Sequence, residues 1–178
     1  MPTAIFRTGD TRAERLDRLR MLTPIGEVEL AASPAGLRSC KLIDAATGAD
    51  SHPARHGQQR RPAYAHVARA SRELSAYFAG DRSPFSVALD PPGTDFQRAV
   101  WDALREIPCG QTRSYAALAR AIGRPTAVRA VGRANGANPL WIIVPCHRVI
   151  GSDGSLTGYA GGVEVKRRLL AHEGSILC

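Results

Sequence analysis

The tripeptide Pro91-Pro92-Gly93 divides the chain, because two prolines and a glycine in succession interrupt any regular helix or strand. Directly after it, Thr94 and Gln97 have the spacing of a capping box, which predicts the start of a helix. A length of 178 residues suits one ordinary domain or two small ones. The break therefore predicts an N-terminal lobe of residues 1–90 and a C-terminal lobe of residues 94–178.

The N-terminal lobe is expected to combine strands with one helix. Alternating polar and apolar side chains are typical of half-buried strands, and apolar residues at helical spacing are typical of a helix packed on a sheet. These patterns predict strands at residues 27–30, 37–43 and 85–89 and a helix from Ala63 to Tyr77. Residues 1–16 and 44–61 have the composition of a solvated arm and a loop. We expect this lobe to serve as scaffold.

The C-terminal lobe is expected to be mostly helical. Apolar spacing predicts helices at residues 94–107, 114–123, 126–135 and 163–172. Ser114 and Thr126 are the expected caps of the second and third helices, which form a helix-turn-helix. The third helix is rich in Ala and Gly, so it offers few side chains that read base edges and suits close approach to DNA.

A short apolar run, Trp141–Val144, predicts a buried strand that Pro145 ends, and Cys146 and His147 follow at the turn. Neighbours in a regular strand point to opposite faces, so only a sharp turn lets this pair cooperate. A free thiol with a pKa of about 8.5 needs a basic or positive neighbour to become a nucleophile. We therefore expect the pKa of the Cys146 thiol to be lowered and the thiol to lie in a cleft lined by arginines. The alternative is that Cys146 and His147 are buried residues without a chemical role.

Positive charge is concentrated around this pair. The formal net charge of +8 and a pI near 10.0 favour a polyanionic partner. All but Lys41 and Lys166 of the 24 basic residues are arginine, a bias that codon usage could also produce. The segment from Ile107 to Ser152 has no Asp or Glu, which suits contact with phosphates. Its basic residues are Arg113, Arg120, Arg124, Arg129, Arg133 and Arg148.

Other kinds of site are not favoured. The four cysteines have no paired or clustered spacing, so the sequence predicts neither disulfides nor a metal site. The residues that could hold a metal in the N-terminal lobe are Cys40, His52, His56 and His66. No nucleotide-binding motif occurs, so no cofactor is predicted. No apolar segment has the length of a membrane span or the character of a signal sequence, so we expect a cytoplasmic protein without a membrane partner.

Several motifs resemble one known family. Pro145-Cys146-His147-Arg148 within IVPCHRVIG, followed by LTGYAGG, resembles the active-site signature of the O6-alkylguanine-DNA alkyltransferases, the methylated-DNA-protein-cysteine methyltransferases. Upstream, GQTRSY, AVRAVG and ANGANP, which begin at positions 110, 127 and 134, also match in order and spacing. The resemblance is dense from Thr94 to Gly174, whereas before Thr94 only Thr23-Pro24-Ile25-Gly26 resembles the family's opening hairpin.

The resemblance implies an α+β protein with a ribonuclease H-like N-terminal lobe. It implies direct-reversal DNA repair: one alkyl group passes irreversibly from O6-alkylguanine, or O4-alkylthymine, to Cys146 after the nucleotide is flipped from the minor groove. A thioether has no good leaving group, so each protein molecule acts once. The implied partner is double-stranded DNA, bound by a monomer, with cooperativity along DNA left open.

The resemblance also implies a role for individual residues. The catalytic set consists of Cys146 as nucleophile, His147 as base acting through a water, Glu173 orienting the histidine and Asn138 holding the turn. Arg129 is the implied finger that replaces the flipped base, and Tyr115 contacts the flipped nucleotide. Arg133, Ala127 and Ala130 lie on the implied DNA-binding helix, and Asn135, Val149, Tyr159 and Ala160 form the implied pocket. Some relatives carry serine in place of Ala160 or a bulkier wall in place of Asn135, which leaves the range of alkyl groups open.

Three other functions remain open from the sequence. An alkyltransferase-like protein without the cysteine binds lesions and flags them, but Cys146 is present here. A helix-turn-helix regulator is disfavoured because the second helix has few base-reading side chains. A cysteine hydrolase is disfavoured because no oxyanion-hole motif is recognisable.

Overall fold

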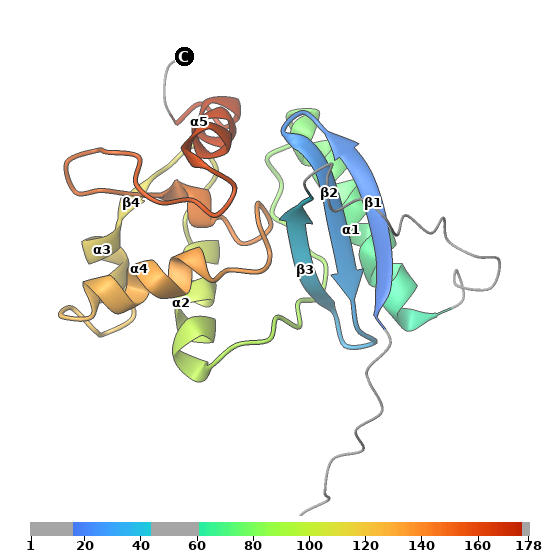
Figure 1. The fold of residues 1–178 in the computed structure, drawn as a ribbon, viewed down its shortest axis with the longest axis horizontal. Helices are drawn as coiled ribbons and strands as arrows, with labels where there is room; N and C mark the ends of the chain where they lie inside the picture. Colours follow the sequence, from blue (N-terminus) through green and yellow to red (C-terminus); the bar gives the residue numbers. More distant parts are fainter. Residues whose placement is uncertain (1–15, 44–60, 176–178) are drawn as a thin grey trace, which may run out of the picture.

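The computed structural model describes residues 16–43 and 61–175. Two lobes lie side by side, a sheet lobe and a helical lobe, which confirms the predicted α+β class (Figure 1). Nearly all of the predicted arm and of the predicted loop, together with His52 and His56, lies outside the described residues.

The N-terminal lobe is a three-stranded antiparallel sheet with one helix on one face (Figure 1). The elements are β1 (Asp17–Thr23), β2 (Gly26–Ala32), β3 (Leu37–Leu42) and α1 (Pro62–Phe78). The two strands predicted at β2 and β3 are confirmed, as is the helix, whose buried positions are those of the apolar pattern. The sequence interpretation missed β1, in which Arg18 and Arg20 both pair with Glu29 of β2. The strand predicted at residues 85–89 is wrong, because only Leu89 makes a bridge, to Leu37.

The C-terminal lobe is mostly helical, as predicted. It contains α2 (Asp95–Arg105), β4 (Arg113–Ser114), α3 (Tyr115–Ala121), α4 (Val128–Gly136), a 3-10 turn η3 (Cys146–Arg148), β5 (Val149–Ile150) and α5 (Val163–His172). The capping box of Thr94 and Gln97 forms, and Ser114 caps α3. The predicted cap at Thr126 is wrong, because Ala127 occupies the N-cap of α4 without a side-chain bond. The indole of Trp101 ties α2 to α4 by donating to the carbonyl of Ala134 at 2.9 Å.

The strand predicted at Trp141–Val144 is wrong, and the segment is a series of tight turns. Leu140 makes one bridge to Cys40 of β3, and this bridge joins the two lobes. The chain then turns at Ile142, which has a φ of 72°, a conformation that costs a β-branched residue about 1–3 kcal/mol. The run is apolar because it is buried between the lobes. A buried strand and a buried turn both require apolar side chains, so the apolar pattern does not distinguish them.

Candidate active site

Asn138 holds the turns that precede the reactive cysteine. Its Oδ1 accepts a hydrogen bond from the amide of Leu140 at 3.0 Å, and its Nδ2 donates to the carbonyl of Val144 at 2.8 Å. Its own carbonyl accepts from the Trp141 indole at 3.1 Å. One buried side chain thus bonds both ends of the strained segment, which fixes the start of η3.

Cys146 begins η3 and is almost completely buried. Asn138, Tyr159 and Lys166 are the polar side chains that influence its thiol. Burial raises the pKa of Cys146 to about 11, and the hydrogen bond from Asn138 and the charge of Lys166 offset burial only in part. The expectation of an acidic thiol is therefore wrong. The thiol is protonated near neutral pH, so a base must remove its proton during the reaction.

His147 has the geometry of such a base. Its Nε2–H donates to Oε1 of Glu173 at 2.9 Å, and both side chains are completely buried. Its Nδ1 is buried and has no hydrogen-bond partner among residues 16–43 and 61–175. Burial lowers the pKa of His147, and the neighbouring Glu173 opposes this only in part. The imidazole is therefore neutral, with its proton on Nε2 and a free lone pair on Nδ1.

Glu173 follows α5 and accepts hydrogen bonds from several parts of the chain. Oε1 accepts from His147, from the hydroxyl of Tyr77 at 2.9 Å and from Nη2 of Arg148 at 2.8 Å. Oε2 accepts from Nε of Arg148 at 2.8 Å and from the amide of Gly110 at 3.4 Å. Burial opposes ionisation, but the hydrogen bonds from His147 and Arg148 and the charge of Arg148 prevail and lower the pKa of Glu173 well below its usual range. Glu173 is a carboxylate that orients the imidazole.

Arg148 differs from its expected place. The sequence interpretation counted it among the positive charges around the thiol, but its guanidinium is buried against Glu173 and the carbonyl of Ile107. The bidentate pair neutralises the two charges. Arg148 therefore adds little to the field that DNA would meet.

Sequence interpretation missed Lys166, a completely buried lysine. Its Nζ donates to the carbonyls of Val149 at 2.6 Å and Thr157 at 2.9 Å, which joins β5 to the loop before α5. Burial lowers its pKa, yet its positive charge favours the thiolate of Cys146. The signal that could have revealed it is helical spacing, since Lys166 lies three and four residues before the buried Leu169 and Leu170.

The four predicted pocket residues come from three segments. Asn135 on α4 donates from Nδ2 to the carbonyl of Cys146 at 3.4 Å. The ring of Tyr159 lies 5.4 Å from that of Trp141, and its buried hydroxyl has no hydrogen-bond partner among the described residues. The carbonyl of Val149 already accepts from Lys166, and Ala160 is exposed. A cavity of about 400 Å³ between the lobes is separate from this group, because Cys146 does not line it.

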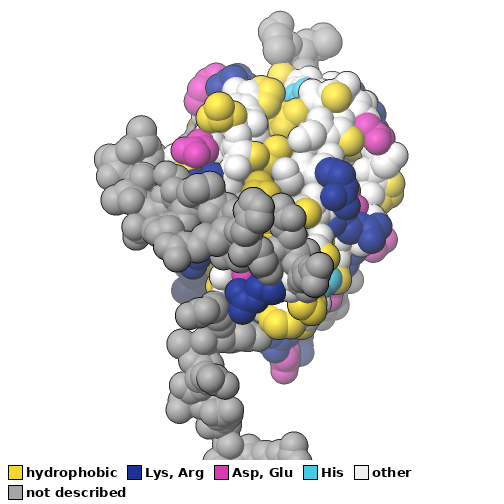
Figure 2. All heavy atoms as spheres, turned by 90° about the vertical axis from the view of Figure 1, so that its right-hand side faces the viewer, with side chains coloured by type: hydrophobic (Ala, Val, Ile, Leu, Met, Phe, Trp, Pro, Cys, Tyr) yellow, Lys and Arg dark blue, Asp and Glu magenta, His cyan; other side chains and the backbone are white. Residues whose placement is uncertain are grey.

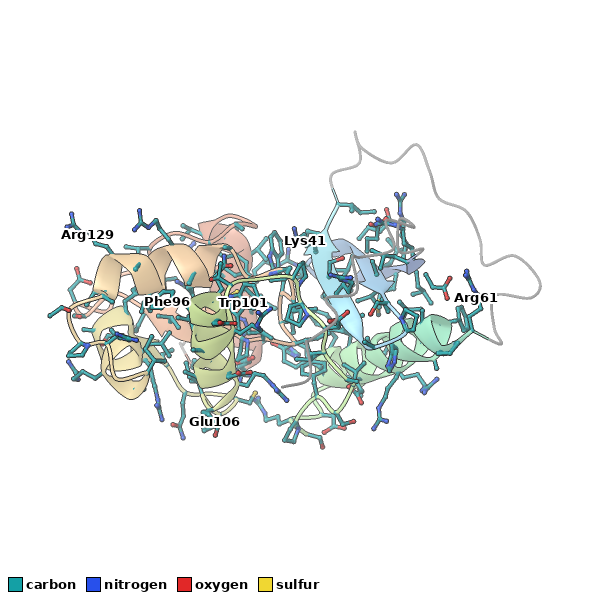
Figure 3. All side chains as sticks on the ribbon, turned by 90° about the horizontal axis from the view of Figure 1, so that it is seen from below. Lys41, Arg61, Phe96, Trp101, Glu106 and Arg129 are labelled. Atoms are coloured by element: carbon teal, nitrogen blue, oxygen red, sulfur yellow. The ribbon has the colours of Figure 1, made fainter. Side chains whose placement is uncertain are left out.

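The predicted DNA-binding residues lie on α3 and α4. Arg129 and Arg133 are exposed, Ala127 and Ala130 are half-buried, and Tyr115 donates weakly to the carbonyl of Thr157 at 3.4 Å. In Figure 3 the side chain of Arg129 extends outward from α4, at the end of the molecule remote from the sheet lobe. Five exposed arginines of β4, α3, α4 and the turn between the two helices form no ion pair with any residue the structure describes: Arg113, Arg120, Arg124, Arg129 and Arg133. We call these five residues the arginine surface.

No cluster of three or more His, Cys, Asp or Glu side chains able to hold a metal occurs within residues 16–43 and 61–175. The helices of those same ranges are all too short or too polar to cross a membrane.

Comparisons with known proteins agree with this geometry. Residues 21–91 match the family described as 6-O-methylguanine DNA methyltransferase, ribonuclease-like domain, and residues 95–175 match the DNA binding domain of the same name. A methylated-DNA-protein-cysteine methyltransferase of Mycolicibacterium paratuberculosis is 48% identical over 151 residues, which cover 85% of this chain and 88% of that protein. One from Salmonella typhimurium is 53% identical over 124 residues, covering 69% and 72%.

Solved structures show the same likeness. The crystal structure of Mycobacterium tuberculosis O6-methylguanine methyltransferase aligns with a TM-score of 0.74 and 43% identity, covering 90% of this chain and 94% of that chain. The crystal structure of Mycobacterium tuberculosis OGT in complex with DNA aligns with a TM-score of 0.72 and 46% identity, covering 88% and 91%.

A buried thiol, imidazole and carboxylate lie together beside the helix pair α3 and α4, an arrangement suited to the activation of a cysteine in a DNA-binding protein. The chain belongs to the 6-O-methylguanine DNA methyltransferase family. It is a methylated-DNA-protein-cysteine methyltransferase, an enzyme of direct-reversal DNA repair.

Proposed function

We propose that Cys146 accepts the alkyl group of O6-alkylguanine in duplex DNA, once per protein molecule. The observation that supports this most is the free Nδ1 of His147 next in sequence to the buried thiol, with Nε2 fixed by Glu173. Direct contact between neighbouring side chains fits poorly, so a water relays the thiol proton to Nδ1. Asn138 keeps the turn in place during this step.

The chemical step balances without a cofactor. The sulfur of Cys146 attacks the alkyl carbon, the S–C bond forms as the C–O6 bond breaks, and the electron pair remains on the guanine. The hydroxyl of Tyr115 gives a proton to the departing base at N3 and regains one through water from the imidazolium of His147, so the net transfer is one proton from thiol to guanine. The thioether product has no good leaving group, so the reaction stops after one turnover. O4-alkylthymine offers the same O-alkyl bond and is the second proposed substrate.

The DNA side of the proposal follows from the exposed residues of α3 and α4. An O6-alkyl group in a duplex is out of reach, so the nucleotide is flipped at a cost of a few kcal/mol. Arg129 fills the gap in the base stack, Tyr115 contacts the flipped nucleotide and Arg133 contacts phosphate. Ala127 and Ala130 let the helix approach the minor groove closely. We infer that a monomer binds, in the cytoplasm, and that cooperativity depends on neighbouring DNA-bound copies.

The flipped base enters between the wall residues Asn135, Val149, Tyr159 and Ala160. The backbone amide of Ala160 is available to donate to the base, while the carbonyl of Val149 keeps one lone pair beside the bond from Lys166. Asn135 leaves a polar wall where a bulkier apolar residue would narrow the pocket.

One experiment tests the proposal. The protein is incubated with an equimolar duplex carrying O6-methylguanine, and its intact mass and peptide map are measured. We expect one added methyl group on the peptide containing Cys146, and none with an unmodified duplex. Cys146→Ser should bind the lesion without gaining mass, whereas Cys109→Ser should behave as the unaltered protein. A methyl group on another residue, or tight binding without transfer, would overturn the proposal.

A further inference from the structure

The N-terminal lobe contacts the active site through the last turn of α1. Tyr77 is buried there, and its hydroxyl donates to Oε1 of Glu173 at 2.9 Å across 96 residues of sequence. This is the oxygen that also accepts from His147 at 2.9 Å. A residue of the sheet lobe thus bonds the same carboxylate oxygen that orients the base.

Additional contacts hold Tyr77 next to Glu173. His172 donates from Nε2 to the carbonyl of Tyr77 at 2.8 Å, and the two rings pack edge to face at 4.9 Å. Arg82 donates to the carbonyl of Glu173 and also to that of His172. The N-terminal lobe therefore holds Glu173 by both its side chain and its backbone.

The tyrosine is a permanent donor in this position. Burial and the nearby charge of Glu173 raise the pKa of Tyr77 far above its ordinary value, so the hydroxyl keeps its proton. Several donors fix the position of Oε1 of Glu173. That position orients the imidazole ring of His147 through Nε2 and therefore sets where Nδ1 points.

We propose that Tyr77 is a positioning residue for alkyl transfer: the N-terminal lobe completes the Cys146, His147 and Glu173 arrangement by holding Oε1 of Glu173 against Nε2 of His147. This inference rests on the proposed function, in which Cys146 is the acceptor and His147 the base. It replaces the expectation that the N-terminal lobe is scaffold alone.

The test uses Tyr77→Phe, which removes one oxygen and keeps the ring. Tyr64→Phe is the matched control, because Tyr64 lies 13 residues earlier on α1, about 20 Å along the helix axis. The single-turnover rate of methyl transfer from a duplex is measured against pH for both variants. Nitrogen-15 spectra of His147 report its tautomer, and mass spectrometry of the unaltered protein tests the acceptor residue separately.

We expect transfer by Tyr77→Phe to be slower by about tenfold, with DNA binding within about twofold of the unaltered protein. Loss of the donor leaves more charge on Glu173, which raises the pKa of His147 while Arg148 and Lys166 still face it. The acid limb of the rate profile should therefore move to higher pH, and the spectra should show a mixture of tautomers. Tyr64→Phe should match the unaltered protein in each measurement.

Two results would overturn the inference. One is an unchanged rate and pH profile in Tyr77→Phe. The other is a slower rate with the acid limb and the Nε2–H tautomer both unchanged, which would make Tyr77 a packing residue only. If the unaltered protein fails to methylate Cys146, the proposed function fails instead, whatever the variant does.

Discussion

The arginine surface and the surroundings of Glu173 use charge in opposite ways. On α3 and α4 the arginines are exposed, and none forms an ion pair within the described part of the chain. At the carboxylate of Glu173 the charged partner Arg148 is buried and bidentate, and His147 and Tyr77 donate to the same oxygen. The outer face of the sheet lobe differs from both regions, because basic and acidic side chains are interspersed on it (Figure 2).

This difference separates binding from chemistry. Unpaired exposed arginines attract phosphates over a distance and are screened by salt. Buried charges are costly to desolvate unless they are paired, so their position is fixed, and fixed position is what a proton transfer requires. Substitutions on the arginine surface should change affinity and salt dependence, whereas substitutions near Glu173 should change the transfer rate.

The largest effect is expected for Glu173→Gln. Without the carboxylate, Arg148 is left buried and unpaired and His147 loses its fixed acceptor, so the transfer rate should fall about 100-fold. The free energy of unfolding should fall by about 3–5 kcal/mol, measured with urea. DNA affinity should stay within about twofold. Glu106→Gln, which alters an exposed acid of the same lobe, is the control.

The same variant should change acid stability. The folded pKa of Glu173 is depressed, so its stabilisation is complete above the ordinary carboxyl pKa of about 4.3 and is lost as pH falls further. Glu173→Gln should lack this component. If Glu173→Gln kept both the transfer rate and the acid sensitivity of the unaltered protein, the buried charges around Glu173 would have no role in the chemistry that the arginine surface lacks.

Lys166→Met should have the next largest effect, because it removes a positive charge that lowers the pKa of Cys146. Two carbonyls, of Val149 and Thr157, would also lose their donor. We expect the thiol pKa to rise above about 11 and transfer to slow by about 30-fold. Alkylation of the thiol by iodoacetamide against pH measures the first quantity. Lys41→Met is the matched control, since Lys41 is the other lysine of the chain and is exposed on β3 (Figure 3); equal effects of both variants would contradict a local role.

Local patterns predicted much of the fold. The capping box at Thr94, the helix-turn-helix and the apolar face of α1 depend on residues within a few turns of one another, so spacing alone reveals them. The segment Trp141–Val144 was predicted wrongly because its turns depend on Asn138 and on burial between lobes. Neither the contact between the lobes nor the positive φ of Ile142 can be predicted from the local sequence.

The candidate site shows the same limit. Motif resemblance named Cys146, His147, Asn138 and Glu173, and the structure brings them together. Tyr77 was assigned to scaffold because its partner lies 96 residues away. The raised pKa of Cys146 was missed for a related reason, since neighbours in sequence suggest charge but only packing determines desolvation.

The pH dependence of transfer sharpens the comparison further. Protonated His147 cannot accept the thiol proton, so the rate should fall about tenfold per pH unit below the pKa of His147, which burial lowers. Above that pKa the rate should level off, and it should rise again toward pH 11 as the thiol ionises directly. DNA affinity should change little across the same range, because arginine keeps its charge. A binding profile that followed the rate profile would mean that one group governs both.

Arg129→Ala should slow repair of duplex DNA by about fivefold and leave reaction with free O6-methylguanine base within about twofold. Only the duplex requires extrusion, so only there does loss of the inserted side chain matter. Single-turnover rates on the two substrates measure the ratio. Arg124→Ala, on the same surface between the two helices, is the control. Equal losses on both substrates would argue against insertion into the base stack.

The smallest effect is expected for Arg133→Ala, which removes one phosphate contact. The affinity for duplex DNA should fall about threefold at physiological salt, independent of sequence, and the slope of log K against log salt should decrease by about 0.9. The transfer rate at saturating DNA should not change. Arg18→Ala on the sheet lobe is the control, because Arg18 is paired with Glu29 and its charge is already compensated. If both variants reduce the slope equally, DNA responds to the net charge of the whole protein, and the arginine surface has no special role.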